Sequence, residues 1–294
     1  MLKSLKNSSR RGILRRLGAF AAGSLAARLN TPAAPVLASA PRPAGSGRLL
    51  ALIGDRYHNY DYIYVSLQKL FQNLQMHADY ITYERFEPSS LKSYQLFVVL
   101  RDGMIWPDGY LGPDAYSDYE RYLEPGYEYE RRTAGQEVSK PWISEEQGRA
   151  IQDFVSAGNG LYALHNSSHI SLSSKPFREV MGGAYVGHPP LRPFLVRVTN
   201  KEHPITQGVS DFIVNDEQHY VDYDKDPSNI FLRSENIDGL DYEQRGPKAI
   251  AGWAHEYGKG RVVFTAVGHN IPAMWQPEYL KIQKNAVRWL LKLA

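Results

Sequence analysis

The stretch GNGLYALHNSSH, residues 158–169, restricts the fold more than any other part of the chain. A glycine-rich turn leads into the unbroken apolar run Leu161–Leu164, which is typical of a strand that is buried on both faces. The run stops at once in His165 and Asn166, and His169 follows four positions after His165. Because the carboxyl ends of parallel strands open into the ligand crevice of an α/β sheet, this pattern predicts a functional site there.

Short apolar runs alternate with segments of helical spacing along the rest of the chain. The runs predict strands at 48–53, 78–83, 94–100, 194–198, 211–214, 230–233, 249–253 and 261–267. Helical spacing occupies 63–74, 144–157, 174–181 and 279–293. This alternation predicts a doubly wound α/β fold with a mainly parallel sheet. The second half of the chain has more strands than helices, so we expect an antiparallel edge there.

The first 40 residues differ in composition from the rest. A twin arginine at Arg10–Arg11 precedes an Ala- and Gly-rich apolar run at 17–27, which is too short to span a bilayer. Small residues follow, and cleavage after Ala38 fits them. We therefore expect a twin-arginine signal peptide and linker at 1–40, and hence a periplasmic or secreted protein. A basic amphipathic surface helix is the alternative, and no later apolar run is long enough to predict a membrane span.

The charge of the chain is concentrated in this leader. Residues 1–40 carry seven cations and no acid, so the remainder has 27 basic and 31 acidic residues although the whole chain has a net charge of +3. The mature chain therefore offers no electrostatic case for binding nucleic acid. The absence of cysteine excludes disulfides, a cysteine nucleophile and thiolate metal sites.

One segment departs from the strand–helix alternation. Residues 103–141 are rich in Tyr, Gly, Pro, Asp and Glu and poor in aliphatic residues. We interpret them as a long loop or lid inserted in a single domain that spans 48–294. The tyrosine rings could stack on sugar faces, or the loop could be an interaction surface that packs on itself, and the composition does not decide between these.

Histidines follow several of the predicted strands. His58, His165 and His269 each come within a few residues after an apolar run. Because the carboxyl ends of parallel strands lie on one side of a sheet, we expect these imidazoles to share one site. Glu217 and His219 are two residues apart, so on extended backbone they point to one face. The residues that we expect to contact a substrate are Asp55, His58, Asn59, Arg101, Asp102, Asn166, His169, His188, His219 and Trp275.

These residue types allow two kinds of chemistry. Neutral imidazoles and a carboxylate can bind a divalent metal such as Zn, with His58, His188, Glu217 and His219 as candidate ligands, or they can transfer protons near neutral pH. No HExxH motif is present, so the spacing alone does not select a metal site. The sequence also lacks a G-x-S-x-G elbow, a Walker loop and a GxGxxG motif, which removes the support for a serine nucleophile or a nucleotide site.

The motifs near the predicted strand ends form an ordered series. They are Leu100–Gly103, Phe154–Gly160, Ala163–Asn166, Met181–Gly183, Gly187–Pro190, His203–Gly208, Asp216–Gln218, Ala251–Trp253, Tyr257–Val262 and Gly268–His269. This series resembles the ThuA-like (trehalose-utilisation) family, over roughly 48–294 and least near 110–138. The resemblance implies a flavodoxin-like α/β/α sandwich of the class I glutamine amidotransferase type.

The resemblance also implies a place for His165 and a class of substrate. His165 would stand near the position of the cysteine nucleophile in an amidotransferase, and because imidazole cannot replace that thiolate, amidotransferase activity is not expected. The family is associated with sugar utilisation, often beside oxidoreductases that form 3-keto sugars. A small carbohydrate and a sugar oxidoreductase of the same pathway are therefore the implied partners.

Three hypotheses for the function follow. The first is an exported enzyme that acts on a disaccharide, a glycoside or a 3-keto sugar, with His165, Glu217 and His269 as catalytic acid–base groups or metal ligands. The second is a non-catalytic sugar-binding protein in which the tyrosine-rich loop, Trp106 and Trp275 stack on the sugar. The third is a metal-dependent hydrolase with a non-sugar substrate. The sequence leaves the presence of a divalent metal open.

Overall fold

The computed structural model describes residues 48–106 and 139–293. The predicted signal peptide at 1–40 lies outside these residues, as does 107–138 of the tyrosine-rich insertion, so both stay predictions. Within the described residues no helix is both long and apolar enough to cross a membrane.

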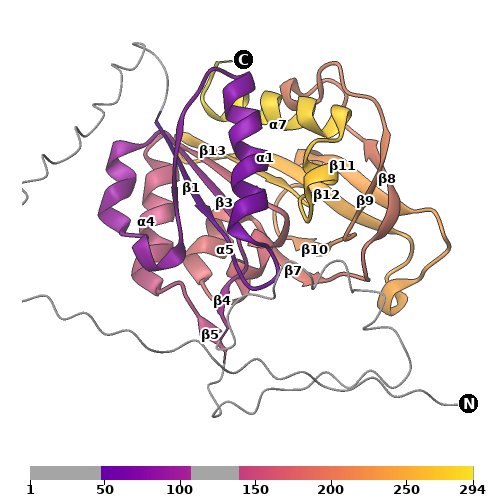
Figure 1. Ribbon diagram of the computed structural model, residues 1–294, viewed down its shortest axis with the longest axis horizontal. Coiled ribbons are helices and arrows are strands. Elements are labelled where there is room, and N and C mark those ends of the chain that lie inside the picture. Colours follow the sequence, from indigo (N-terminus) through magenta and orange to yellow (C-terminus); the bar gives the residue numbers. More distant parts are fainter. Residues whose placement is uncertain (1–47, 107–138, 294) are drawn as a thin grey trace, which may run out of the picture. The chain divides into compact units, whose positions relative to one another are not determined.

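A single nine-stranded sheet organises the described part of the chain (Figure 1). Its strands, in spatial order, are β2 (Ala78–Ile81), β1 (Leu49–Ile53), β3 (Leu96–Leu100), β6 (Gly160–Leu164), β13 (Gly260–Thr265), β12 (Lys248–Tyr257), β11 (Ile230–Asn236), β8 (Arg192–Val198) and β9 (Phe212–Asp216). The five strands from β2 to β13 are parallel to one another, and the pairs from β13 to β9 are antiparallel. The predicted α/β class, with its antiparallel edge, is therefore confirmed.

Helices cover the parallel half of the sheet. They are α1 (Tyr60–Asn73), α4 (Glu145–Ser156), α5 (Lys175–Met181), α6 (Ile271–Met274) and α7 (Pro277–Leu290). α1 packs with α6 and α7, whereas α4 packs with α5. The chain passes from β1 through α1 to β2 at the edge of the sheet, and from β3 through α4 to β6 near its centre. Because these two crossovers run in opposite directions along the sheet and both are right-handed, α1 and α4 lie on opposite faces. The strands from β8 onward are joined without long helices, which permits antiparallel pairing.

Local sequence signals set the helix ends. Ser144 begins α4 with a reciprocal capping box to Gln147, as the polar residues before the apolar periodicity predict. Ser174 caps α5, and Gly182 ends that helix in the left-handed conformation at φ 78°. The chain can then turn directly into the small antiparallel pair β7 (Gly183–Gly187) and β10 (Tyr220–Tyr223). A second short pair joins β4 (Met104–Ile105) to β5 (Lys140–Pro141).

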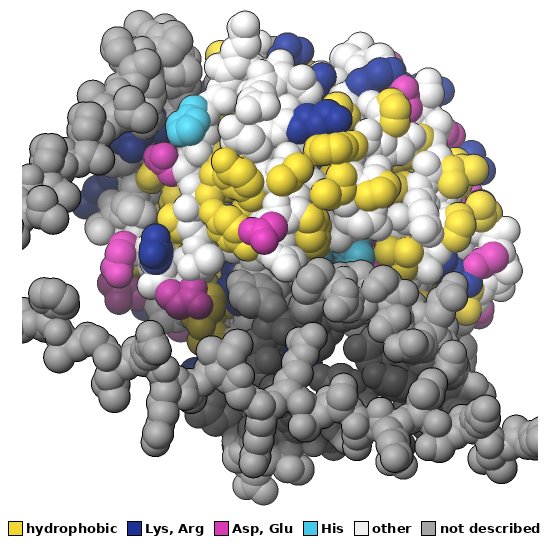
Figure 2. All heavy atoms as spheres, viewed as in Figure 1, with side chains coloured by type: hydrophobic (Ala, Val, Ile, Leu, Met, Phe, Trp, Pro, Cys, Tyr) yellow, Lys and Arg dark blue, Asp and Glu magenta, His cyan; other side chains and the backbone are white. Residues whose placement is uncertain are grey.

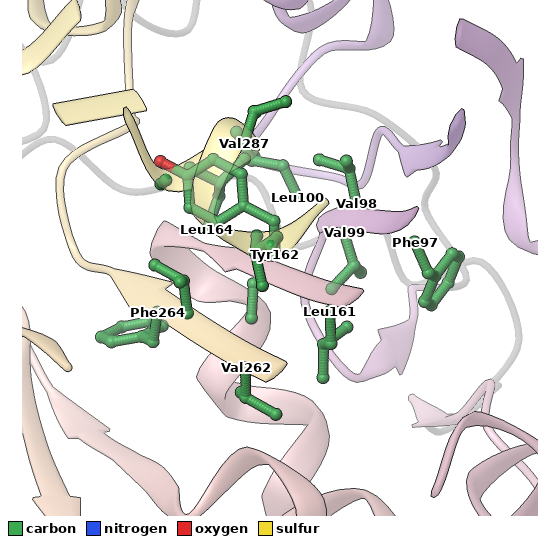
Figure 3. Packing of buried hydrophobic residues seen from close by; sticks show 14 of the residues in the cluster. Phe97, Val98, Val99, Leu100, Leu161, Tyr162, Leu164, Val262, Phe264 and Val287 are labelled. Carbon is green, nitrogen blue, oxygen red and sulfur yellow. The ribbon is translucent and has the colours of Figure 1, made fainter. Parts of the chain in front are cut away.

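The core lies on both faces of the central strands. All residues of β1, β3 and β6 are buried, which explains why each reads as a continuous apolar run. Figure 3 shows side chains of β3, β6 and β13 packing together, among them Val99, Leu161, Tyr162 and Phe264. This packing fixes the strands whose carboxyl ends carry the polar residues described below.

The face that carries α1 is mixed in chemistry. Apolar side chains gather there, and charged side chains interrupt them (Figure 2). Tyr64 and Val65 of α1 are exposed. Single exposed apolar side chains of this kind are normal on a soluble surface, so this face by itself indicates no ligand.

Candidate functional site

Polar side chains gather where the parallel strands end. Asp55 and His58 follow β1, Asp102 follows β3, His165 follows β6 and His269 follows β13. Parallel pairing places these four strand ends at one edge of the sheet, as the sequence predicts. β9 runs in the same direction and brings Asp216 and Glu217 toward this edge.

Glu217 is the centre of the site. Its Oε2 atom lies 3.1 Å from His269 Nδ1, 3.3 Å from His165 Nε2, 3.5 Å from His219 Nε2 and 3.6 Å from His188 Nε2. We call Glu217 with His58, His165, His188, His219 and His269 the Glu217 cluster. Burial alone would raise the pKa of Glu217, but the facing His269 and the contacts from His165 and His219 hold it well below its usual value. The carboxylate is therefore ionised near neutral pH.

His165 occupies a strained turn. Its φ is 52°, in the left-handed region that a residue with a side chain seldom adopts, and it opens the 3₁₀ helix His165–Leu172 directly after β6. A Cβ added to Gly268 would lie 2.8 Å from the His165 Cβ, so position 268 has no room for any residue larger than glycine. Strain of this kind concentrates at functional sites, because surrounding contacts have to maintain it.

Hydrogen bonds set the direction of the His165 ring. Nδ1 lies 2.7 Å from the carbonyl oxygen of Ala266, to which it donates, so Nε2 faces Glu217. Burial lowers the pKa of His165, but the neighbouring Glu217 and Asp216 outweigh this and raise it. The side chain is completely buried, so its ring has one fixed orientation.

Asp55 orients His58. Its Oδ1 lies 2.9 Å from His58 Nδ1, and its Oδ2 accepts from Asn166 Nδ2 at 2.6 Å and from the Asp102 backbone N–H at 2.8 Å. Asn166 Nδ2 also lies 2.8 Å from His58 Nδ1. We assign the Nδ1 proton to the bond with Asp55, because a carboxylate is the stronger acceptor. His58 Nε2 is then directed at His269 Nδ1, 3.2 Å away.

Asp216 holds the loop of His269 against Glu217. Its buried carboxyl accepts from the backbone N–H of Gly268 at 2.7 Å and of His269 at 3.1 Å, and also from the N–H of Glu217. Burial raises the pKa of Asp216. The sequence analysis missed this residue, although an acidic residue at the end of a strand and directly before Glu217 was a signal that could have identified it.

His219 and His188 form a stack beside Glu217. The ring planes of His188 and His219 meet at 14° with centroids 4.9 Å apart, and His219 also lies 4.1 Å from the His165 ring. His188 Nδ1 contacts the carbonyl oxygen of Pro189 at 2.9 Å, which leaves Nε2 facing Glu217. His219 is buried, and neither of its ring nitrogens has a hydrogen-bond partner within the described residues. Burial and the neighbouring His165 lower the pKa of His219 well below its usual value.

Three of the predicted substrate contacts have other tasks. Asn59 caps α1 by accepting from the Asp61 backbone N–H. Arg101 is buried, donates to the carbonyl oxygens of Gly54, Asp102 and Met104, and has its guanidinium 4.5 Å from the centre of the Tyr83 ring. Trp275 packs under Lys69 of α1, whose Nζ lies 3.6 Å from the ring centroid. These contacts support the fold, and the role of the three residues as substrate contacts stays a prediction.

Aromatic rings lie beside the Glu217 cluster. The Tyr185 ring lies 5.4 Å from those of His219 and His169. His169 therefore borders the cluster through Tyr185 and does not contact Glu217. The sequence analysis missed Tyr185, because one tyrosine on a short strand carries no signal of its own.

A second aromatic pair lies next to Asp102. Trp106 donates from Nε1 to Asp102 Oδ2 at 2.6 Å, and its ring meets that of Tyr57 edge-on at 5.5 Å. Burial, together with the nearby Asp55, raises the pKa of Asp102 to about 6. Asp102 thus connects this aromatic pair to the Asp55–His58 unit through the backbone hydrogen bond to Asp55.

Two groups of side chains in the described residues could hold a metal ion. One is His58, His165, Glu217 and His269, and the other is His188, Glu217 and His219; in each, one ligand atom per residue lies within 4.8 Å of all the others. The same atoms could act as proton donors and acceptors, since an ionised carboxylate faces imidazoles of raised and of lowered pKa.

Comparisons with known proteins agree with this architecture. The family model ThuA, described as trehalose utilisation, matches residues 134–290, which is more than half of the chain. A ThuA-like protein from Parabacteroides merdae has a TM-score of 0.58 at 14% identity, covering 84% of this chain and 90% of that one. A ThuA-like protein from Bacteroides uniformis has a TM-score of 0.54 at 14% identity, covering 86% and 95%.

A β-galactosidase from Rahnella sp. R3 has a TM-score of 0.51 at 12% identity, covering 85% of this chain and 32% of that one. These identities show a shared fold and no more. No curated protein matches the chain.

Proposed function

The chain belongs to the ThuA (trehalose-utilisation) family, and from that premise we propose that it is an enzyme of carbohydrate metabolism that works through the Glu217 cluster. Its substrate is a disaccharide, a glycoside or a 3-keto sugar. The observation that carries the proposal is the ionised carboxylate of Glu217 with four imidazole nitrogens within 3.6 Å. A structural carboxylate needs one or two partners, whereas this one gathers side chains from separate loops.

A 3-keto sugar suits such a cluster, because its carbonyl acidifies the neighbouring C2–H bond. A base takes the C2 proton, the electron pair of that bond forms the C1–C2 double bond, and the bond from C1 to the departing oxygen breaks. An acid donates a proton to that oxygen, so the elimination needs no oxidant, reductant or water. The Glu217 cluster offers both groups, since positioned imidazoles and carboxylates transfer protons near neutral pH.

The aromatic rings support a sugar as the ligand. Tyr185 lies against His219, and the pair Tyr57–Trp106 lies against Asp102. Such rings can stack on the C–H faces of a sugar while polar groups bind its hydroxyls. The same rings favour a second candidate function, a sugar-binding protein without catalysis, which predicts tight binding of an intact sugar and no product.

We extend the proposal to the place and partner of the reaction. The twin-arginine pattern supports export, so the enzyme would meet its sugar in the periplasm or outside the cell. An oxidoreductase that forms 3-keto sugars would supply the substrate. Fusing 1–40 to a reporter that is active only after export tests the first point, and replacing Arg10–Arg11 by two lysines should abolish that export.

The experiment for the main proposal follows turnover by carbon NMR. Purified protein is incubated with 3-ketotrehalose, with 3-keto glycosides and with the same sugars unoxidised. We expect a new unsaturated or isomerised sugar from at least one oxidised substrate, and loss of that product in Glu217→Gln. The exposed His77 provides a matched control, since His77→Ala should keep the wild-type rate. Binding without any product would favour the sugar-binding alternative, and equal turnover in Glu217→Gln would refute the proposal.

A further inference from the structure

We propose that His58, His165, His269 and Glu217 bind one divalent transition-metal ion, which keeps two coordination positions open for a sugar that chelates through adjacent oxygens. This inference rests on the proposed function and specifies the chemistry of the same site. The ligand atoms are Nε2 of His58 and His165, Nδ1 of His269 and Oε2 of Glu217. His188 and His219 are not ligands in this assignment.

Three of the separations among the four atoms fit one ion, and all of them lie within 4.8 Å. Glu217 Oε2 lies 3.1 Å from His269 Nδ1 and 3.3 Å from His165 Nε2, and His269 Nδ1 lies 3.2 Å from His58 Nε2. Bonds of about 2.1 Å place neighbouring ligands about 3.0 Å apart in an octahedron and about 3.4 Å apart in a tetrahedron. The observed distances fall between these values, so the ion could enter with small movements of the side chains.

The ring planes distinguish this group from the other one. An imidazole binds a metal through a lone pair in the plane of its ring, so planes that cross can share one ion. The planes of His58, His165 and His269 cross at 74°, 80° and 66°. Those of His188 and His219 are nearly parallel, at 14°, and the rings stack with centroids 4.9 Å apart, an arrangement less suited to sharing one ion. The ring geometry therefore favours the first group for the ion.

The surrounding hydrogen bonds hold the ligands ready. Asp55 binds His58 Nδ1 and the Ala266 carbonyl binds His165 Nδ1, which leaves the opposite nitrogen of each ring directed inward. Metal-binding histidines nearly always have a carboxylate or carbonyl partner of this kind on the other nitrogen. His165 Nε2 is fully buried and makes no hydrogen bond within the described residues. A cation at the cluster would satisfy this nitrogen.

The donor set limits the identity of the ion. Three imidazoles and one carboxylate suit Mn, Fe, Co, Ni or Zn in the divalent state, whereas hard ions such as Ca²⁺ prefer oxygen ligands. Four protein ligands would close a tetrahedral zinc site, as in structural centres. A six-coordinate ion instead keeps two positions, and neighbouring carbonyl and hydroxyl oxygens of a keto sugar can occupy both.

The test measures metal content and coordination without any turnover assay. Untagged protein is stripped with a chelator, reloaded separately with Mn²⁺, Co²⁺, Ni²⁺ and Zn²⁺, desalted and analysed for metal. We expect about one equivalent in the wild type, His188→Ala and His77→Ala, and less than a tenth of that in His58→Ala and Glu217→Gln. Circular dichroism checks that each variant is folded.

The Co²⁺ form then reports the open positions. Six-coordinate cobalt absorbs visible light weakly, and a change in this absorption when a 3-keto sugar is added would support the proposal. Intense absorption, typical of four-coordinate cobalt, that does not change with the sugar would refute the two open coordination positions. Absence of metal, or equal loss in His188→Ala, would overturn the assignment of ligands. Turnover by metal-free protein would leave the proposed function standing while refuting this inference.

Discussion

Two regions of the molecule bury histidine in different ways. His255 on β12 donates from Nε2 to the Val180 carbonyl oxygen at 3.0 Å, and its Nδ1 lies 3.4 Å from the Tyr223 hydroxyl. Burial lowers the pKa of His255 to about 4, so it is a neutral residue of the core. In the Glu217 cluster, by contrast, inward nitrogens of His165 and His219 lack hydrogen-bond partners within the described residues and face a carboxylate.

Burial alone therefore does not identify a functional histidine. Both regions contain buried imidazoles against a sheet. His255 satisfies its polar atoms within the fold, as most buried polar groups do. The cluster leaves polar atoms unsatisfied and directs them to one point, which costs stability unless a ligand occupies that point. The direction of the lone pairs therefore separates the two cases.

The largest effect should come from Glu217→Gln. The change keeps the shape of the side chain but removes the charge that faces four imidazoles, so we expect turnover to fall by about a thousandfold. His255→Gln is the matched comparison and should retain most of the activity, because His255 makes no contact with the cluster. Turnover rates measured by NMR show whether the loss is confined to Glu217→Gln. Similar losses in the two would break the distinction between the regions.

The next effect is the pH dependence of the free energy of unfolding that arises from His255. Its pKa is about 4 when folded and 6.5 when unfolded, so the unfolded state binds a proton first as pH falls. The stabilisation from the neutral ring is complete above pH 6.5, falls as pH decreases and is gone below pH 4. We expect a loss of at most about 3.4 kcal/mol across this window. Urea titrations at pH 7, 5.5 and 4 should show this slope reduced in His255→Gln, and an unchanged slope would contradict the assignment.

A smaller effect is expected from the residue that orients His58. Asp55→Asn keeps the size of the side chain but weakens the acceptor for His58 Nδ1, so metal affinity should fall by about 10- to 100-fold. Calorimetric titration with Co²⁺ measures it. Asp224→Asn, which removes a partner of Arg178 on the surface, is the control and should leave the affinity unchanged. Equal affinities in Asp55→Asn and the wild type would show that Asp55 only supports the fold.

The smallest effect should come from His188→Ala. His188 is the most exposed imidazole of the cluster, at 30%, and it stacks on His219 instead of crossing its ring plane. We expect metal affinity to change less than about threefold and the KM for the sugar to rise less than about tenfold. A large loss of metal in this variant would place the ion in the second group.

Much of the fold could be predicted from the sequence, because strands that are buried on both faces consist of continuous apolar residues. β1, β3, β6 and β13 lie close to their predicted positions, and their common direction places His58, His165 and His269 at one edge. Turn and cap residues such as Ser144 and Gly182 also act locally, so their roles can be inferred from a few neighbours.

The rest of the site depends on contacts between distant segments, which spacing along the chain does not record. Tyr185 contacts the cluster only because β7 is brought to it by tertiary packing. Likewise, the sequence does not show that Arg101 donates to the carbonyl oxygens of Gly54 and Met104. No pattern in the sequence could show that His58, His165 and His269 cross at steep angles while His188 and His219 stack.

The most direct test of the account is a crystal structure of the metal-loaded protein with anomalous diffraction recorded at the absorption edge of the metal. We expect one strong peak about 2.1 Å from the inward atoms of His58, His165, His269 and Glu217, with His188 and His219 outside bonding distance. A peak between His188 and His219, or no peak in crystals grown with excess metal, would contradict it.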